Sequence, residues 1–224
     1  MKIFLDTADV AEIHWAAKAG LIDGVTTDPT LLSHATGARH PGAVLAEICA
    51  AVNGPVSAEV VSVDADGMYR EGKDLARIAD NIVVTVPMIE EGLAAVRRLV
   101  ADGVVVNVSL VFSAMQALLA ARAGASCVVL YVGRLDDIGQ DGTEVVRQIR
   151  TIFRNYEIET EVLAASLRHP THALRAALAG ADIGTMPAAV LRQLLLHPLT
   201  DRGVDQFLND WSRIGHHPAP ETTP

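Results

Sequence analysis

Two acidic residues stand inside apolar stretches of this sequence, where they could do acid–base chemistry. Asp6 ends the run 2–6 (KIFLD), and Glu59 interrupts the run 56–61 (VSAEVV). A carboxylate in an apolar strand is costly to bury without a partner, so both are stronger candidates than a surface acid for a general acid and a general base. The alternatives are that Asp6 caps the following helix and that Glu59 joins a buried hydrogen-bond network.

Further polar residues end or interrupt other apolar runs, and these candidates are Asp28, Thr85, Asn107, Ser109, Tyr131 and Ser166. Alternation along a strand sends Asn107 and Ser109 to the same side, where they could bind a ligand or satisfy polar groups of the core. Arg134 follows the run 127–132, and its guanidinium could bind a phosphate or a carboxylate there. It could instead pair with Asp136 or Asp137.

The elements that must position these residues are eight short, β-branched apolar runs, which predict strands at 2–6, 24–28, 56–61, 82–86, 104–109, 127–132, 161–166 and 182–186. Helical patterns separate them, and Gly20, Gly54, Gly103, Gly124 and Gly180 follow these segments as C-terminal glycines do. Eight βα units predict a (βα)8 TIM barrel with the site at the carboxyl ends of its strands. An open doubly wound sheet ranks second, because no glycine-rich loop follows the first run.

Composition excludes several classes of partner. The chain has 224 residues, a net charge of −9 and 50% hydrophobic residues, enough for one large core. No basic cluster is present, which argues against nucleic acid and anionic membranes, and no apolar stretch resembles a transmembrane or signal segment. Cys49 and Cys127 are isolated and indicate a reducing cytoplasm. No Cys or His set has metal-ligand spacing, so we expect neither a metal nor another cofactor; His216 and His217 lie in the tail.

The C-terminal region differs from the rest. Apolar residues between 204 and 211 predict one extra amphipathic helix, which could pack on a neighbouring subunit or cover its own barrel. We therefore expect one barrel domain at 1–211, including this helix, and a flexible, proline-containing tail at 212–224.

Several segments together resemble those of a known family, the small transaldolases and the related fructose 6-phosphate aldolases. They occur in the expected order between residues 3 and 211, and they are FLDTAD at 4–9, GVTTDPT at 24–30, VP at 86–87 with EGL at 91–93, NVSLVFS at 107–113, QA at 116–117, VGRLDD at 132–137, AASLR at 164–168 and HPLTD at 197–201. The resemblance implies a homo-oligomer, with a ring-like decamer as the expected assembly and the C-terminal helix at its contacts.

The same resemblance implies a class I aldol mechanism without a cofactor. In the family, a lysine on the fourth strand forms a Schiff base with a ketose phosphate and holds dihydroxyacetone until an aldehyde accepts it. That lysine precedes a Val-Pro or Ile-Pro pair, and here Thr85 stands before Val86-Pro87. A hydroxyl cannot form an iminium. Lys2, Lys18 and Lys73 are the only lysines, and we expect each to lie away from the site.

Other positions transfer from the family one by one. Asp6 matches the acid near the Schiff base, Glu59 matches the transaldolases, and Ser109 replaces a threonine that helps to hold the catalytic water. Tyr131 is closer to the aldolases, whereas Arg134 and Ser166 match the phosphate-binding pair. Asp28 stands where the family commonly has an asparagine that contacts substrate hydroxyls, and Ile89 also departs from the usual threonine.

Three functions follow as hypotheses. The first is a transaldolase-type enzyme that transfers dihydroxyacetone between sugar phosphates (sedoheptulose 7-phosphate or fructose 6-phosphate with glyceraldehyde 3-phosphate or erythrose 4-phosphate), disabled here by Thr85. The second is a lysine-free relative in which Asp6, Glu59 and Tyr131 move protons on a sugar phosphate. The third is a sugar-phosphate-binding protein without turnover. We favour the first, because the other site residues remain.

Overall fold

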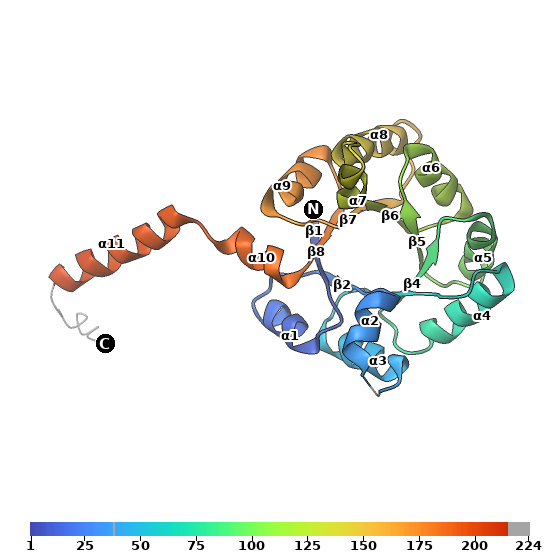
Figure 1. Cartoon of the computed structure of the whole chain (residues 1–224), viewed down its shortest axis with the longest axis horizontal. Helices are drawn as coiled ribbons and strands as arrows, with labels where there is room; N and C mark the ends of the chain where they lie inside the picture. The colour runs from blue at the N-terminus through green and yellow to red at the C-terminus, as the bar shows by residue number, and fades with distance from the viewer. Residues whose placement is uncertain (38, 215–224) are drawn as a thin grey trace, which may run out of the picture.

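A closed barrel of parallel strands forms the centre of the computed structural model, which describes residues 1–37 and 39–214 (Figure 1). The strands pair in chain order, and β8 pairs with β1 to close the barrel. This confirms the predicted (βα)8 fold, and the doubly wound alternative is wrong. The strands are β1 (Lys2–Asp6), β2 (Gly24–Thr26), β3 (Val56–Glu59), β4 (Ile82–Pro87), β5 (Val106–Val111), β6 (Cys127–Tyr131), β7 (Glu161–Ala165) and β8 (Ile183–Met186).

Helices surround the barrel, and each strand connects to the next through at least one of them (Figure 1). They are α1 (Val10–Lys18), α2 (Pro29–Thr36), α3 (Pro41–Ala51), α4 (Ala65–Ala76), α5 (Glu90–Ala101), α6 (Ala114–Ala123), α7 (Val132–Asp137), α8 (Gly142–Asn155), α9 (Pro170–Ala179), α10 (Ala188–Leu195) and α11 (Pro198–Ile214). Gly124 and Gly180 end α6 and α9 in the left-handed conformation, which a residue with a side chain adopts at a cost.

Two apolar regions hold the barrel together. The larger lies between the strands and the helices and includes Val84, Val86 and Leu99. The smaller lies inside the barrel and is formed by Phe4, Cys127, Val129, Leu163, Ala165 and Ile183. Because alternate residues of a strand face opposite sides, Thr85 lies between two residues of the outer core and faces the barrel interior. The inner cluster thus forms the floor beneath any polar residue further along the strands.

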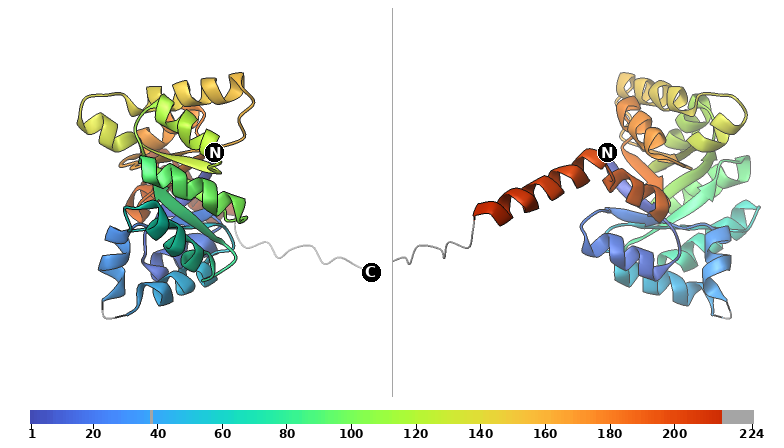
Figure 2. Two further views of the ribbon diagram at one scale, coloured as in Figure 1. Left: turned by 90° about the vertical axis from the view of Figure 1, so that its right-hand side faces the viewer. Right: turned by 60° about the vertical axis from the view of Figure 1, so that its left-hand side comes forward.

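The C-terminal helix α11 extends away from the barrel, as Figures 1 and 2 show. None of its residues is buried, so it does not cover its own barrel, and that alternative is wrong. The helix ends at Ile214, so residues 212–214 belong to it and not to the predicted tail. The remainder of that tail, 215–224 with His216 and His217, lies outside the described residues.

Both cysteines, Cys49 and Cys127, are buried and unpaired. Within the described ranges, no helix has the length and apolar character needed to cross a membrane.

Candidate active site

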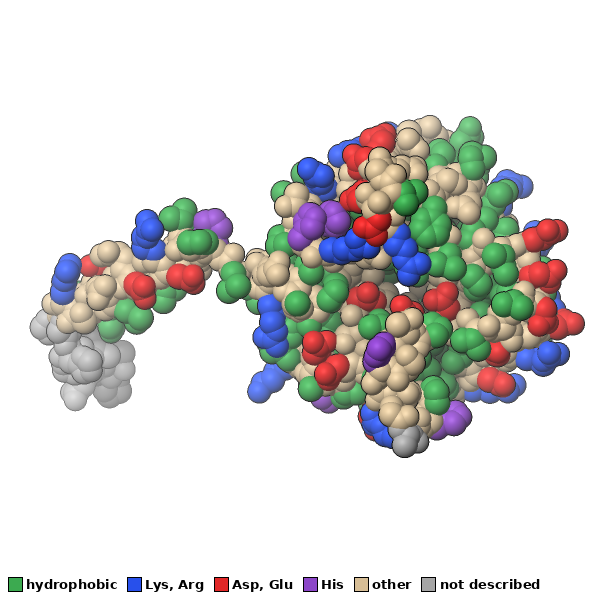
Figure 3. All heavy atoms as spheres, in the orientation of Figure 1, with side chains coloured by type: hydrophobic (Ala, Val, Ile, Leu, Met, Phe, Trp, Pro, Cys, Tyr) green, Lys and Arg blue, Asp and Glu red, His purple; other side chains and the backbone are tan. Residues whose placement is uncertain are grey.

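A cavity of about 210 Å³ opens at the carboxyl ends of the strands. Eight of the nine site residues predicted from the sequence line it, and they are Asp6, Asp28, Glu59, Thr85, Ser109, Tyr131, Arg134 and Ser166. The barrel brings them together because the ends of parallel strands meet on one face. In Figure 3, acidic side chains border the hollow at the centre of the barrel on one side and basic side chains border it on the other.

Asp6, the last residue of β1, accepts a hydrogen bond of 2.8 Å from the Thr26 hydroxyl. The Thr26 and Thr185 hydroxyl oxygens lie 2.6 Å apart, so a chain of hydroxyls leads to the carboxylate. Burial raises the pKa of Asp6 to about 6, with Asp28 adding to the increase and Thr26 and Arg134 opposing it. Asp9, not Asp6, caps α1, so the capping alternative is wrong.

Glu59, the last residue of β3, accepts a hydrogen bond from the Ser109 hydroxyl, which is the kind of contact that the hydrogen-bond-network alternative expects. Burial raises the pKa of Glu59, whereas this hydrogen bond and the Arg134 charge lower it. Asn107 faces the same interior but does not line the cavity. Its amide nitrogen lies 3.4 Å from the Ser57 oxygen, which places it one layer below the site.

Thr85 lies on β4 directly beside Glu59 of β3 and Asn107 of β5 in the strand register. Its side chain is 4% exposed, and its hydroxyl is the only buried side-chain polar atom without a hydrogen-bond partner among residues 1–37 and 39–214. A buried hydroxyl without a partner destabilises a protein, because the hydrogen bonds it made with water are not replaced. The Thr85 hydroxyl therefore lies at the edge of the cavity and can still form a hydrogen bond with a ligand.

Arg134 lies on α7, one turn after Tyr131 at the end of β6. Its guanidinium carbon lies 4.4 Å from the centre of the Tyr131 ring, and the ring of Phe112 lies 5.8 Å from that of Tyr131. This stacking fixes the guanidinium plane over the cavity mouth and leaves its N–H groups for an anion. Burial raises the pKa of the Tyr131 phenol, so this residue stays protonated and can donate a hydrogen bond.

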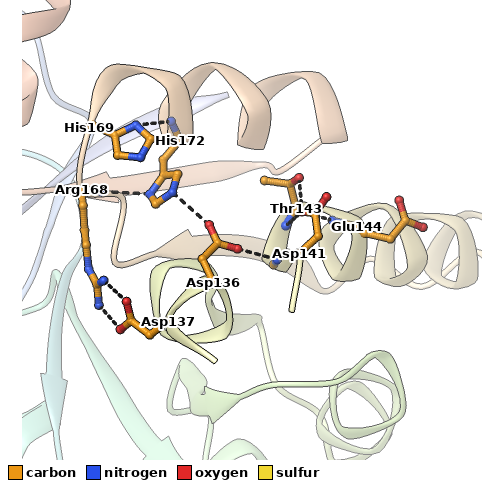
Figure 4. A network of polar contacts seen from close by, with 9 residues as sticks. Asp136, Asp137, Asp141, Thr143, Glu144, Arg168, His169 and His172 are labelled. Atoms are coloured by element: carbon orange, nitrogen blue, oxygen red, sulfur yellow. Dashed lines mark hydrogen bonds and ion pairs between the residues drawn. The ribbon is translucent and has the colours of Figure 1, made fainter. Parts of the chain in front are cut away.

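The predicted alternative partners of Arg134 are both engaged elsewhere (Figure 4). Asp137 forms a two-pronged ion pair with Arg168, and Asp136 contacts the Nε2 atom of His172 at 2.9 Å. The Nδ1 atom of His172 accepts a hydrogen bond from the Arg168 backbone, so Nε2 carries the proton that Asp136 accepts. This network links α7 with the segment after β7, and it leaves Arg134 available to a ligand.

Ser166 follows β7 and adopts the left-handed conformation with a φ of 57°, which is unusual for a serine. Its carbonyl oxygen would lie 2.3 Å from a Cβ atom at Gly133, so only glycine allows α7 to approach this closely. The strained turn thereby places the serine at the cavity on the same side as Arg134.

Asp28 has a structural role as well as a place in the cavity wall. It caps α2 by accepting a hydrogen bond of 2.7 Å from the Leu31 backbone. Four hydroxyl residues that the sequence reasoning missed also line the cavity, and they are Thr26, Thr27, Ser57 and Thr185. The alternation within β2, β3 and β8 was the signal that could have found three of them.

The cavity can bind a small, hydroxyl-rich anion and can exchange protons with it. It offers one guanidinium, three carboxylates, one phenol and several hydroxyls over a floor of apolar side chains. Across the described residues, no group of three or more His, Cys, Asp and Glu side chains could hold a metal ion.

Comparison with known proteins agrees with this arrangement. Residues 3–217 match the model of the family described as Transaldolase/Fructose-6-phosphate aldolase. A probable transaldolase of Herpetosiphon aurantiacus is 56% identical over 96% of both chains, and one of Aquifex aeolicus is 55% identical over 97% of this chain and 100% of its own. A probable transaldolase of Thermoplasma volcanium is 51% identical over 96% of both chains. With its eight-stranded barrel and its ring of polar residues at the strand ends, this chain is a member of the transaldolase/fructose-6-phosphate aldolase family.

Proposed function

We propose that this chain keeps a transaldolase-type site for sugar phosphates but lacks Schiff-base catalysis, because Thr85 occupies the position of the reactive lysine. The observation that carries the proposal is the content of the cavity wall, which combines acids, hydroxyls and one arginine with no lysine among its described members. An iminium needs a primary amine, and a threonine hydroxyl cannot replace it as an electron sink.

The three lysines of the chain are all described, and none of them lines the cavity. Lys2 begins β1 at the opposite end of the barrel, where its Nζ atom lies 2.7 Å from Glu161. Lys18 lies in the last turn of α1. Lys73 lies on α4, where its Nζ atom lies 2.9 Å from Asp102. The absence of all three from the cavity wall supports the loss of covalent catalysis.

The binding half of the proposal depends on Arg134 and Ser166. A guanidinium with free N–H groups binds phosphate through charge-assisted hydrogen bonds, and a neighbouring hydroxyl adds a further donor. The hydroxyls and carboxylates deeper in the cavity suit the hydroxyl groups of a sugar. We expect ketose phosphates such as fructose 6-phosphate as donors and aldose phosphates such as erythrose 4-phosphate as acceptors in the lysine-containing form.

The test restores the amine. Thr85→Lys and the unmodified chain are incubated with fructose 6-phosphate, reduced with borohydride and measured by intact mass, alongside transfer to erythrose 4-phosphate. A trapped adduct and transfer activity in the lysine variant alone support the proposal. Thr85→Met, of similar length but without an amine, is the matched control and gives neither signal. If Thr85→Lys shows neither a trapped adduct nor transfer activity, the proposal of a retained transaldolase site is wrong.

A second candidate function is proton transfer without a covalent intermediate, and the Asp6 carboxyl favours it. Its pKa of about 6 lets this group both give and take a proton near neutral pH. The unmodified chain would then exchange carbon-bound protons of fructose 6-phosphate with deuterated water, and Asp6→Asn would remove the exchange. No exchange above the Asp6→Asn background rules this function out.

We further propose that the chain forms a homo-oligomer through α11, with a decameric ring as the assembly that family resemblance suggests. The helix exposes an apolar stripe that its own barrel leaves uncovered, formed by Leu199, Val204, Phe207, Leu208, Trp211 and Ile214. An exposed stripe of this kind indicates a protein interface. The two buried, unpaired cysteines also agree with a reducing cytoplasm as its location.

A further inference from the structure

The cavity carries more negative charge than its own residues can balance. Asp6, Asp28 and Glu59 line it, and Arg134 is the only cationic side chain among its described lining residues. If a phosphate binds Arg134, as the proposed function requires, the guanidinium charge is used and three carboxylates face the remaining space. A ligand with only hydroxyl groups would leave that charge without a counterion in a partly buried site.

Two of these carboxylates also have acceptor capacity to spare. Each carboxylate can accept about four hydrogen bonds. Asp6 accepts one side-chain hydrogen bond, from Thr26, and Glu59 accepts one, from Ser109. Asp28 uses one oxygen to cap α2. The unused lone pairs of Asp6 and Glu59 therefore suit a donor that carries several hydrogens and a positive charge.

Thr85 provides an independent observation at the same place. Its side chain is buried and lines the cavity beside Glu59, and its hydroxyl has no partner within the described structure. A hydroxyl oxygen can accept a hydrogen bond from an ammonium group. A bound ammonium would therefore satisfy this hydroxyl and neutralise the neighbouring carboxylates at the same time.

We propose that the ligand of this cavity carries a primary ammonium group, held by Asp6, Glu59 and Thr85, at the opposite end from a phosphate held by Arg134 and Ser166. The ligand class is an amino sugar phosphate or amino polyol phosphate, so that the amine belongs to the ligand and not to the protein. This inference rests on the proposed sugar-phosphate site and narrows its substrate class. The cavity, about 210 Å³, is smaller than the roughly 300–1,000 Å³ of typical drug-sized pockets and suits such a metabolite.

The titration of the two acids agrees with this assignment. Burial raises the pKa of both Asp6 and Glu59, and the Arg134 charge offsets this increase only in part. A ligand ammonium would supply a further cation and favour the ionised carboxylates. Binding of the amine would then be linked to proton release from the site.

The experiment compares two acyclic phosphates that differ in one group, 2-amino-2-deoxyglucitol 6-phosphate and glucitol 6-phosphate, by calorimetry at pH 7.5 and constant ionic strength. The expected result is at least tenfold tighter binding of the amine. Glu59→Gln should reduce the affinity for the amine by a larger factor than the affinity for glucitol 6-phosphate, because it removes the charge that only the amine requires. Asp201→Asn, the same loss of charge on the exposed helix α11, is the matched control and should change neither.

Thr85→Lys provides the reverse test, because a protein ammonium beside Glu59 would repel the ligand amine. This variant should lose the preference for the amine or invert it. Equal binding of the two phosphates by the unmodified chain, reduced in Arg134→Gln, would overturn the amine inference and leave the proposed sugar-phosphate site standing. Binding of neither compound would overturn both.

Discussion

The Thr85 hydroxyl, which has no hydrogen-bond partner within the described residues, predicts how one substitution changes the stability of the protein. Thr85→Val exchanges this hydroxyl for a methyl group of nearly the same size and keeps the β-branched shape that suits strand β4. The hydroxyl is buried and unbonded, so the exchange removes a desolvation cost without breaking a hydrogen bond. The variant should therefore be more stable than the unmodified chain when no ligand is present.

The magnitude follows from the cost of a buried, unsatisfied polar group, which is about 1–3 kcal/mol. Because the cavity beside Thr85 lets solvent approach the site, we expect the lower part of this range, about 1–2 kcal/mol. For a domain of this size, 1 kcal/mol corresponds to about 2–4 °C, so the melting temperature should rise by about 2–8 °C. Urea denaturation at pH 7.5, without sugar phosphates, measures the same difference.

Thr26→Val is the matched control, because it makes the same chemical exchange at a neighbouring buried strand position. The Thr26 hydroxyl bridges Asp6 and Thr185, and its removal leaves both without this partner. This variant should lose about 1–3 kcal/mol. If Thr85→Val is neutral or destabilising, the Thr85 hydroxyl has a hydrogen-bond partner in solution, and the cost assigned to it does not exist.

Three further predictions concern pH, ligand binding and assembly. The pKa of Asp6 rises from 3.8 to about 6 on folding, so the folded state holds the proton more tightly, and stability should fall by roughly 3 kcal/mol as pH increases from about 4 to about 6. Asp6→Asn should remove that part of the slope in urea titrations across this range, and an unchanged slope would contradict the assigned pKa. Arg134→Gln should weaken fructose 6-phosphate binding by about 10- to 150-fold, because hydrogen bonds to a charged group are worth about 1.5–3 kcal/mol; calorimetry measures this, and equal affinities of the variant and the unmodified chain would remove Arg134 from the phosphate site. Asp137→Asn breaks the exposed ion pair with Arg168 and should change the free energy of unfolding by less than about 1 kcal/mol in a denaturation experiment. The double variant Phe207→Ser, Trp211→Ser should reduce the particle mass in light scattering without changing the free energy of unfolding of the barrel. Gln206→Ser on the same helix should leave the particle mass unchanged, and an unchanged mass in the double variant would exclude α11 as the contact between subunits.

Hydrophobic periodicity was sufficient to predict the barrel, because a short, mostly apolar run marks each strand between helical patterns. Strand boundaries differ from the predicted ones by at most two residues. The largest difference is at β5, which begins at Val106 and runs to Val111, and not from 104 to 109. Val105 is half exposed before the strand, and Leu110 adopts a positive φ where the pairing with β6 shifts. Such an irregularity depends on the neighbouring strand, so the β5 sequence alone could not show it.

The site was only partly predictable for a similar reason. Residues at strand ends could be found one by one, because the barrel brings all strand ends to one face. In the link from Thr185 through Thr26 to Asp6, Thr26 and Thr185 lie 159 positions apart in the sequence, and the link depends on the register of three strands. Asn107 was placed with Ser109 by alternation, but the depth of each residue along β5 puts only Ser109 in the cavity. Alternation gives the side of a strand, and depth requires the closed barrel.

Two residues of the cavity lower the stability of the fold, and this cost bears on whether the cavity binds a ligand. Asp6 is ionised at neutral pH against the effect of burial, and the Thr85 hydroxyl is buried without a partner. Asp6→Asn and Thr85→Val would each remove one of these costs with almost no change in side-chain size. A barrel with no ligand would gain from either exchange, so the present residues make sense if a bound molecule satisfies them. A ligand that meets both groups should therefore stabilise the unmodified chain more than the Asp6→Asn or Thr85→Val variant, and equal stabilisation of all three would show that the ligand contacts neither group.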